Sequence, residues 1–142
     1  MFMLQTAVKS AKVREKFSQF VDSVIHESPR IVNRTRDYFL AININHLAPL
    51  VQDYYLTVEL QQDELGSFIA TFKEIPDLIG YAETDSEAIE QLVNNLIEYA
   101  HDYLTESFSL YFKAPNRQAH FPYVLKVMMQ NSAEDVMSFI RV

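Results

Sequence analysis

The chain has 142 residues, enough for one ordinary domain or two very small ones, and 49% of them are apolar, so a packed core is expected. It contains no cysteine and only two glycines, which excludes disulfides, thiolate metal sites, cysteine nucleophiles and glycine-rich phosphate-binding loops. No stretch approaches the roughly 20 apolar residues of a membrane-spanning helix. Residues 1–10 lack the charged and apolar regions of a secretory signal, so we expect a cytoplasmic protein with no membrane partner.

The net charge of −7 is distributed unevenly along the chain. Residues 1–52 hold seven basic and four acidic residues, a net charge of +3. Residues 53–142 hold five basic and fifteen acidic residues, a net charge of −10. An acidic protein is a poor partner for nucleic acid, but a basic segment within it can still bind phosphates. The asymmetry therefore predicts two parts with different tasks, over residues 1–52 and 54–142.

The first part is predicted to fold as strand, helix, hairpin and short helix. Ser10 can cap a helix that runs to about His26. The apolar side chains of this helix recur at helical spacing and are Val13, Phe17, Phe20, Val21 and Val24. After Ser28-Pro29, two short apolar runs flank the polar stretch 33–37, a pattern typical of a hairpin. Asn45 can then cap a last short helix.

This first part is too small to be stable alone. About 50 residues bury little apolar surface, and one helix on one hairpin leaves apolar groups exposed on the far side. Pairing with a second copy is the simplest remedy. We therefore expect a homodimer or a higher assembly, with Phe17 and Val21 in or beside the shared core.

The second part begins with three predicted strands and a long helix. The strands are Tyr55–Leu60, Ser67–Phe72 and Ile79–Glu83, the first two joined by a polar turn. Thr84 and Glu87 fit a capping box, in which the hydroxyl and the carboxylate satisfy each other's free backbone donors. The helix that follows runs to about Thr105, with a buried stripe of Ile89, Leu92, Val93, Leu96, Ile97, Ala100, Tyr103 and Leu104.

The end of the second part is predicted to add one strand and one helix. Residues 113–121 read as a polar connection, and Tyr123–Met129 as a fourth strand. Ser132 can cap a terminal helix that contains Val136, Phe139 and Ile140. The predicted order of this part is therefore β-β-β-α-β-α, which can build one sheet with helices on a face.

Residues 55–104 resemble the HicB antitoxin domain. The motifs that carry the resemblance are Gly66-Ser67-Phe68-Ile69-Ala70-Thr71-Phe72, Ile75-Pro76-Asp77-Leu78, Gly80 and Thr84-Asp85-Ser86-Glu87-Ala88. They match the family's hairpin, its turn before the third strand and the opening of its long helix, although the family's glycine-rich second strand is reduced here to Gly66. The resemblance implies a partial ribonuclease H-like fold that serves as an acidic binding domain.

Residues 1–52 resemble the amino-terminal segment of the Phd/YefM antitoxin family over about 45 residues. The matching stretches are Val13-Arg14-Glu15-Lys16-Phe17-Ser18, Pro29-Arg30-Ile31-Val32-Asn33-Arg34 and Phe39-Leu40-Ala41-Ile42. The resemblance implies a β-α-β-β-α dimerisation segment in which Arg14 and Arg34 contact operator DNA. Lys9, Lys12 and Arg36 are further candidate DNA-binding residues. Family members usually end in a flexible tail that wraps a toxin, whereas here a HicB-like domain takes its place.

Together these features predict an α+β antitoxin or antitoxin-like transcriptional autoregulator. It is expected to dimerise, to bind and repress its own promoter DNA, and to neutralise a toxin protein, with no catalytic residues and no cofactor. The alternative is a structural interaction protein that acts through the acidic HicB-like domain and never binds DNA. The charge of each part and the family resemblances favour the first hypothesis.

Two other functions are less well supported. The four histidines, His26, His46, His101 and His120, are far apart and lack ligand partners at helical or hairpin spacing, so no metal site is expected. Glu59 and Asp77 at the strand ends, with Asp63 and Glu64 in the turn, are the candidate ligands of a two-metal nuclease. No further carboxylate is expected at mid-strand, so a charged edge that keeps the sheet soluble is favoured.

Overall fold

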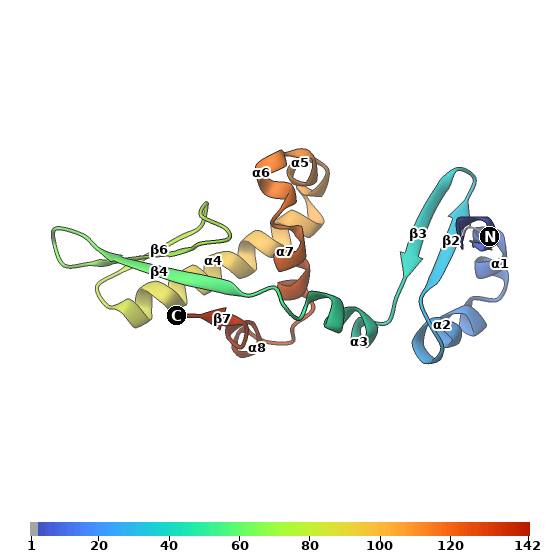
Figure 1. Cartoon of the computed structure of the whole chain (residues 1–142), viewed down its shortest axis with the longest axis horizontal. Coiled ribbons are helices and arrows are strands. Elements are labelled where there is room, and N and C mark those ends of the chain that lie inside the picture. Colours follow the sequence, from blue (N-terminus) through green and yellow to red (C-terminus); the bar gives the residue numbers. More distant parts are fainter. Residues whose placement is uncertain (1–2) are drawn as a thin grey trace. The chain divides into compact units, whose positions relative to one another are not determined.

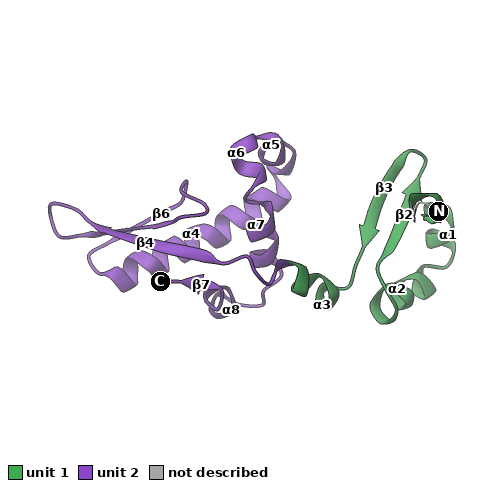
Figure 2. Ribbon diagram, viewed as in Figure 1, with its two compact units in different colours: residues 1–50 green, residues 51–142 purple. Residues whose placement is uncertain are grey.

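The computed structural model describes residues 3–142 and contains two compact units, Met1–Leu50 and Val51–Val142 (Figures 1 and 2). We call them unit 1 and unit 2. Each unit combines helices with a sheet of its own, so the α+β prediction is confirmed. In the described part of the chain, no helix is long and apolar enough to cross a membrane.

Unit 1 carries its helices on a three-stranded sheet. Its elements are η1 Met3–Thr6, β1 Val8–Lys9, α1 Ser10–Glu15, α2 Phe17–His26, β2 Arg30–Arg34, β3 Asp37–Ala41 and α3 Ile44–Leu47, followed by η2 Ala48–Val51. The strand order is β1-β2-β3, with β1 parallel and β3 antiparallel to β2. Val32 on the central strand is fully buried and lies opposite both Val8 and Phe39. The order of strand, helix, hairpin and short helix agrees with the prediction.

Three local predictions for unit 1 are wrong in detail. The expected single helix over residues 10–26 breaks at Lys16, whose backbone leaves the helical region at φ −126° and ψ 50°. Ser10 is the first residue of α1, and the cap residue is Lys9, which makes no side-chain cap bond. The short helix is capped by Asn43, not by Asn45. The Asn43 side-chain oxygen Oδ1 accepts from the Asn45 N–H, and the side-chain amide of Asn43 donates to the Ile25 carbonyl at 3.0 Å, which ties α3 to the end of α2.

Unit 2 is built on a four-stranded sheet in the order β6-β5-β4-β7. The strands are β4 Leu56–Gln62, β5 Phe68–Phe72, β6 Ile79–Ala82 and β7 Ile140–Arg141. The first three confirm the predicted strands, with ends that differ by one or two residues. Asp63 shapes the turn between β4 and β5, because its Oδ1 accepts the N–H groups of Leu65 and Ser67. Gly66 supplies the left-handed conformation of this turn, with φ +88°.

The long helix α4, Asp85–Thr105, is also confirmed and covers one face of this sheet. The Thr84 hydroxyl accepts the N–H of Glu87 at 3.2 Å, which confirms one half of the predicted capping box; the return bond from the Thr84 N–H to the Glu87 carboxylate is not formed within residues 3–142. Six side chains of the helix are buried: Ala88, Leu92, Val93, Leu96, Ala100 and Tyr103. They form one core with Leu56, Val58, Ala70, Phe72 and Ile75 from the sheet side and Val124, Val127, Val136 and Phe139 from the carboxyl-terminal segments.

The predicted fourth strand over Tyr123–Met129 is wrong. This stretch lies in helix α7, Phe121–Met128, which packs on α4. The predicted polar connection contains α6, Pro115–Gln118, and begins at the end of α5, Phe108–Lys113. The terminal helix is present as α8, Ala133–Met137, with the Ser132 hydroxyl accepting from the Asp135 N–H. It contains Val136 but ends before Phe139 and Ile140, which the prediction includes, and Ile140 begins β7 instead. The remaining strand is β7, so unit 2 has the order β-β-β-α, four short helices and a final strand.

Candidate functional site

Arg14 and Arg34 lie at the same place on unit 1. Arg14 comes from α1 and Arg34 from the end of β2, and with Ser10 and Ala11 they line an open depression of about 340 Å³. Both residues are exposed, and neither forms an ion pair within residues 3–142. The sheet explains their proximity, because β1 leads directly into α1 while pairing in parallel with β2. Two cations from separate elements therefore border one open hollow.

The other candidate basic residues divide between two places. Lys9 lies opposite Asn33 in the β1–β2 ladder, next in sequence to Arg34, and is exposed. Arg36 is exposed in the β2–β3 turn, beside Thr35, whose φ of +57° is left-handed. Lys12 instead lines a separate depression of about 300 Å³ that includes Lys16 and Arg30. Lys9 and Arg36 thus lie close to Arg34 in strand register and in sequence but do not line its hollow, and Lys12 lines a different one.

Arg30 differs from Arg14 and Arg34, because its guanidinium is bound by other side chains of unit 1. Its guanidinium donates to the hydroxyls of Ser23 and Ser28 and lies 3.3 Å from the Glu27 carboxylate. It therefore ties the start of β2 to the end of α2. Arg14 and Arg34 have no such bond within residues 3–142, so their hydrogen-bond donors remain available for an external anion.

The predicted interface residues Phe17 and Val21 also meet at one surface of unit 1. They line an apolar groove of about 420 Å³ formed by α2 and the end of β3, together with Phe20, Val24, Ile25, Leu40, Ala41 and Ile42. Phe17 is 61% exposed and Leu40 is 55% exposed. Of the described side chains of unit 1, only Val24 and Val32 are buried apolar residues. Most apolar side chains of the described part of unit 1 are therefore exposed or only partly buried.

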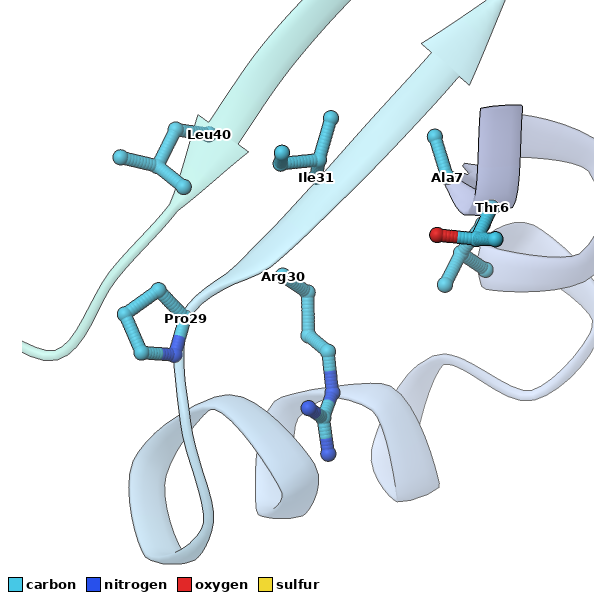
Figure 3. A pocket seen from close by; sticks show the side chains of 7 residues that line it. Thr6, Ala7, Pro29, Arg30, Ile31 and Leu40 are labelled. Carbon is cyan, nitrogen blue, oxygen red and sulfur yellow. The ribbon is translucent and has the colours of Figure 1, made fainter. Parts of the chain in front are cut away.

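A second hollow of about 420 Å³ is also lined by Leu40 (Figure 3). It is lined by Thr6 and Ala7 before β1, by Pro29, Arg30 and Ile31 at the start of β2, and by Leu40. The close-up shows Leu40 and Ile31 projecting from adjacent strands, while the Arg30 side chain turns toward the helices. Leu40, on strand β3, thus lines both hollows. Sequence reasoning missed this residue, although the run Phe39–Ile42 is apolar without the alternation of a half-buried strand.

In unit 2, Asp77 belongs to a polar network with two aromatic partners. Its carboxylate lies 3.7 Å from Arg117 Nη2 and 3.9 Å from His120 Nε2. The Tyr99 hydroxyl lies 2.8 Å from His120 Nδ1 and accepts from Arg117 Nη1 at 3.3 Å, and the guanidinium stacks over the Tyr111 ring at 4.4 Å. This network fastens the turn after β5 to α4, α5 and α6.

Burial governs the protonation of this network. Desolvation raises the pKa of Tyr99 to about 12, so its hydroxyl stays neutral. Desolvation lowers the pKa of His120 from 6.5, and the Asp77 carboxylate opposes this shift. A neutral His120 that bonds to a neutral Tyr99 is a stable structural arrangement at neutral pH.

The carboxylates considered for a nuclease do not assemble. Asp63 holds the β4–β5 turn, and its Oδ2 accepts from the Tyr81 hydroxyl at 2.7 Å, which lowers the pKa of Asp63. Asp77 bonds to Arg117, while Glu59 and Glu64 are exposed. Within residues 3–142 there is no group of three or more histidine or acidic side chains that could hold a metal ion.

The comparisons with known proteins converge on one family. A family model named PHD-like, described as "Antitoxin of toxin-antitoxin, RelE / RelB, TA system", matches residues 3–142. A solved structure from Syntrophomonas wolfei subsp. wolfei, described as the antitoxin part of a proposed toxin/antitoxin system, is similar along nearly its whole length. The two chains share 34% identity with a TM-score of 0.83, covering 94% of this chain and 95% of that one. No curated protein matches the chain significantly.

Proposed function

Because this chain belongs to the PHD-like family of antitoxins from toxin–antitoxin systems, we propose that it is a dimeric antitoxin that binds its own promoter DNA. Unit 1 would supply the dimer contact and the DNA contact, and unit 2 would bind the toxin that an antitoxin implies. No catalytic step and no cofactor form part of this function. The resemblances of residues 1–52 to Phd/YefM antitoxins and of residues 55–104 to HicB domains support the same division.

The observation that carries the DNA proposal is the pairing of Arg14 and Arg34. Two guanidiniums from different elements border one open depression, and neither forms an ion pair within the described residues. Such a pair suits the phosphate backbone or a guanine edge, both of which accept bidentate arginine bonds. Lys9 and Arg36, exposed nearby in register and sequence, would add phosphate contacts. Unit 1 is also the only basic half of the chain.

The exposed apolar groove of unit 1 supports the dimer. Phe17, Leu40 and Ile25 are each more than two-fifths exposed and line the groove with Val21. Covering such side chains contributes about 25 cal/mol per Å² of apolar surface. A twofold contact would cover the groove on both copies at once, and it would place two Arg14–Arg34 pairs on one assembly. A dimer can then contact two half-sites of an operator.

The net charge of −10 on residues 53–142 supports toxin binding by unit 2. Toxins that act on nucleic acid need basic surfaces, and an acidic domain can mask such a surface by charge complementarity. The same charge repels DNA phosphates, so unit 2 would not compete with unit 1 for the promoter.

A promoter titration tests the DNA proposal. The promoter fragment of the chain's own gene is titrated at two salt concentrations with the wild type and with the Arg14→Ala, Arg34→Ala double variant. We expect the double variant to bind at least about tenfold more weakly and with a shallower dependence on salt, because each lost phosphate contact removes roughly one released counterion. The matched control is Lys73→Ala, Lys113→Ala, which removes the same charge from exposed positions of unit 2.

The outcomes separate the two candidate functions. Weaker binding by the arginine variant alone supports the DNA-binding antitoxin. Equal binding by all three proteins, or binding by none, favours the alternative of an interaction protein that acts through unit 2 without DNA.

A further inference from the structure

The sheet of unit 2 has one edge that is closed by side chains. The edge strand β6 directs the Tyr81 N–H and the Ile79 carbonyl away from β5. The Tyr81 N–H donates to Gln91 Oε1 at 2.6 Å, and the Asn95 amide donates to the Ile79 carbonyl at 2.7 Å. Both partners come from α4. An incoming strand would have to displace them, so this edge is protected against strand addition.

The opposite edge is only partly covered. Strand β7 pairs with β4 at Leu56 and Thr57, and β4 continues to Gln62 without a strand on that side. The alternation of backbone bonds shows which groups are open. The Thr57 carbonyl accepts from Lys73 and the Asp63 N–H donates to Ser67, both toward β5. Residues of the same parity, Glu59 and Gln61, face β5 as well, so Leu60 and Gln62 direct their backbone groups to the open side.

This open edge carries one protecting charge, Glu59, and otherwise lacks the usual protection. Exposed edges in proteins are commonly blunted by charged side chains, lysine above all, by proline or by a bulge. Residues 58–62 read Val-Glu-Leu-Gln-Gln, with no lysine and no proline, and their pairing with β5 is continuous. Leu60 shares a face with the buried Leu56 and Val58 but is 38% exposed, because the core ends before it. A strand laid beside β4 would cover Leu60 and pair its backbone.

The charge around the edge favours a basic occupant. Glu59 on β4 and Glu64 in the following turn are exposed, and residues 51–142 carry a net charge of −10. A second copy of this edge would bring two strongly acidic units together, which like-charge repulsion opposes. A segment with lysine or arginine beside Glu59 would be attracted instead.

We propose that the open edge of β4, residues 58–62, docks an extended, basic segment of the toxin as an added strand of the unit 2 sheet. This inference rests on the proposed function, since it assigns the toxin partner to a place. Main-chain hydrogen bonds from Leu60 and Gln62 hold the segment, Leu60 contributes apolar contact, and Glu59 selects for positive charge.

Hydrogen exchange on the full chain provides the first test. The probe is the purified protein encoded by the gene next to that of this chain, added in excess. In the free chain, the amides of Leu60 and Gln62 should exchange rapidly, while those of Glu59 and Gln61 are protected by β5. In the complex, Leu60 and Gln62 should slow by at least about tenfold, which corresponds to roughly 1.4 kcal/mol of added protection. Protection that alternates along the strand in this way is specific to strand addition.

A proline variant provides the second test. Leu60→Pro removes an N–H that points away from β5 and for which residues 3–142 show no partner, and proline is tolerated at strand edges, so unit 2 should keep its fold. We expect affinity for the neighbouring protein to fall about tenfold, because one main-chain bond is lost and the approach is blocked. The matched control, Leu60→Ala, keeps the N–H and should bind more tightly than Leu60→Pro. Circular dichroism verifies the fold of both variants.

The outcomes distinguish a failure of the edge proposal from a failure of the proposed toxin partnership. If the neighbouring protein binds but protects other amides, or binds Leu60→Pro as well as wild type, the edge proposal is overturned and the toxin partnership stands. If the neighbouring protein does not bind the wild type at all, the toxin partnership fails and the edge proposal fails with it. If Leu60→Pro proves unfolded, the exchange pattern of the wild-type complex decides alone.

Discussion

A β-carbon built on Gly80 would lie 2.1 Å from the carbonyl oxygen of Ala88, so β6 and α4 touch at backbone distance. The backbone nitrogen of Leu92 would lie 2.7 Å from the same β-carbon. We predict that Gly80→Ala destabilises unit 2 by about 3 kcal/mol, because helix backbone cannot move aside as a side chain can. Urea unfolding followed by circular dichroism measures the change.

The control for this prediction is Gly66→Ala. Gly66 has φ +88° but open space around it, with Gln62 Nε2 3.8 Å away as the nearest atom. Only the left-handed strain remains there, which costs about 1 kcal/mol. Equal effects of the two substitutions would contradict the close approach at Gly80.

The buried His120 should make unit 2 sensitive to mild acid. Its pKa is lowered in the folded chain by desolvation, so at a pH below the ordinary value of 6.5 the unfolded chain binds more protons than the folded one. The free energy of unfolding should therefore fall as the pH drops through and below 6.5. Urea unfolding at pH 7.5 and pH 5.5 measures the difference, which His120→Gln should reduce. His101→Gln, at an exposed position of α4, should leave it unchanged.

Lys126 should stabilise the first residues of unit 2 through hydrogen bonds to their backbone carbonyls. It is 8% exposed, and its ammonium donates to the carbonyls of Gln52 and Tyr54 while lying over the rings of Tyr55 and Phe139. Lys126→Met keeps the length of the side chain but leaves two carbonyls without their donor, and should cost about 2 kcal/mol. Lys113→Met, at an exposed position, is the comparison in thermal melts. A melting temperature unaffected by Lys126→Met would refute the role.

The apolar groove of unit 1 predicts how the dimer can be broken. Phe17→Ser with Val21→Ser should convert the chain to a monomer, since both side chains line the groove that the second copy would cover. Light scattering at tens of micromolar, about the range where modest interfaces still form, measures the mass. Leu65→Ser in the β4–β5 turn removes an apolar side chain that is 89% exposed and lies outside the groove, and it should leave the dimer intact. A wild type that is monomeric at this concentration would rule out the dimer.

The sequence suffices to predict the elements whose structure is decided by local interactions. The Thr84 cap, the stripe of α4 and the strands on either side of the Asp63 turn all follow from short-range patterns, and each is present. The break at Lys16 was invisible, because α1 and α2 share one apolar spacing and no proline or glycine separates them.

The segment 121–128 shows where pattern reading failed. Its run of β-branched and aromatic residues resembles a buried strand, but Pro122 in the first turn is a helix-start signal, and Val124 and Val127 are buried at a spacing of three. Packing against α4 decides between the two forms, and that contact is not local. Arg14 and Arg34 line the same depression because β1 pairs in parallel with β2. This pairing is not visible in the local sequence, so only the family resemblance indicated that the two arginines act together.

The pairing of β7 with the start of β4 has a kinetic consequence. The two strands join residues that are separated by all of β5, β6 and α4 to α8, so their contact closes a long loop. Loop closure of this kind is an entropic cost that only a nearly complete core can offset, and the ladder involves only two residue pairs. Strand β7 should therefore be among the last elements to form during folding and among the first to open in the native protein. Each time β7 detaches, the side of β4 that faces it would lack a paired strand along its whole length, from Leu56 to Gln62.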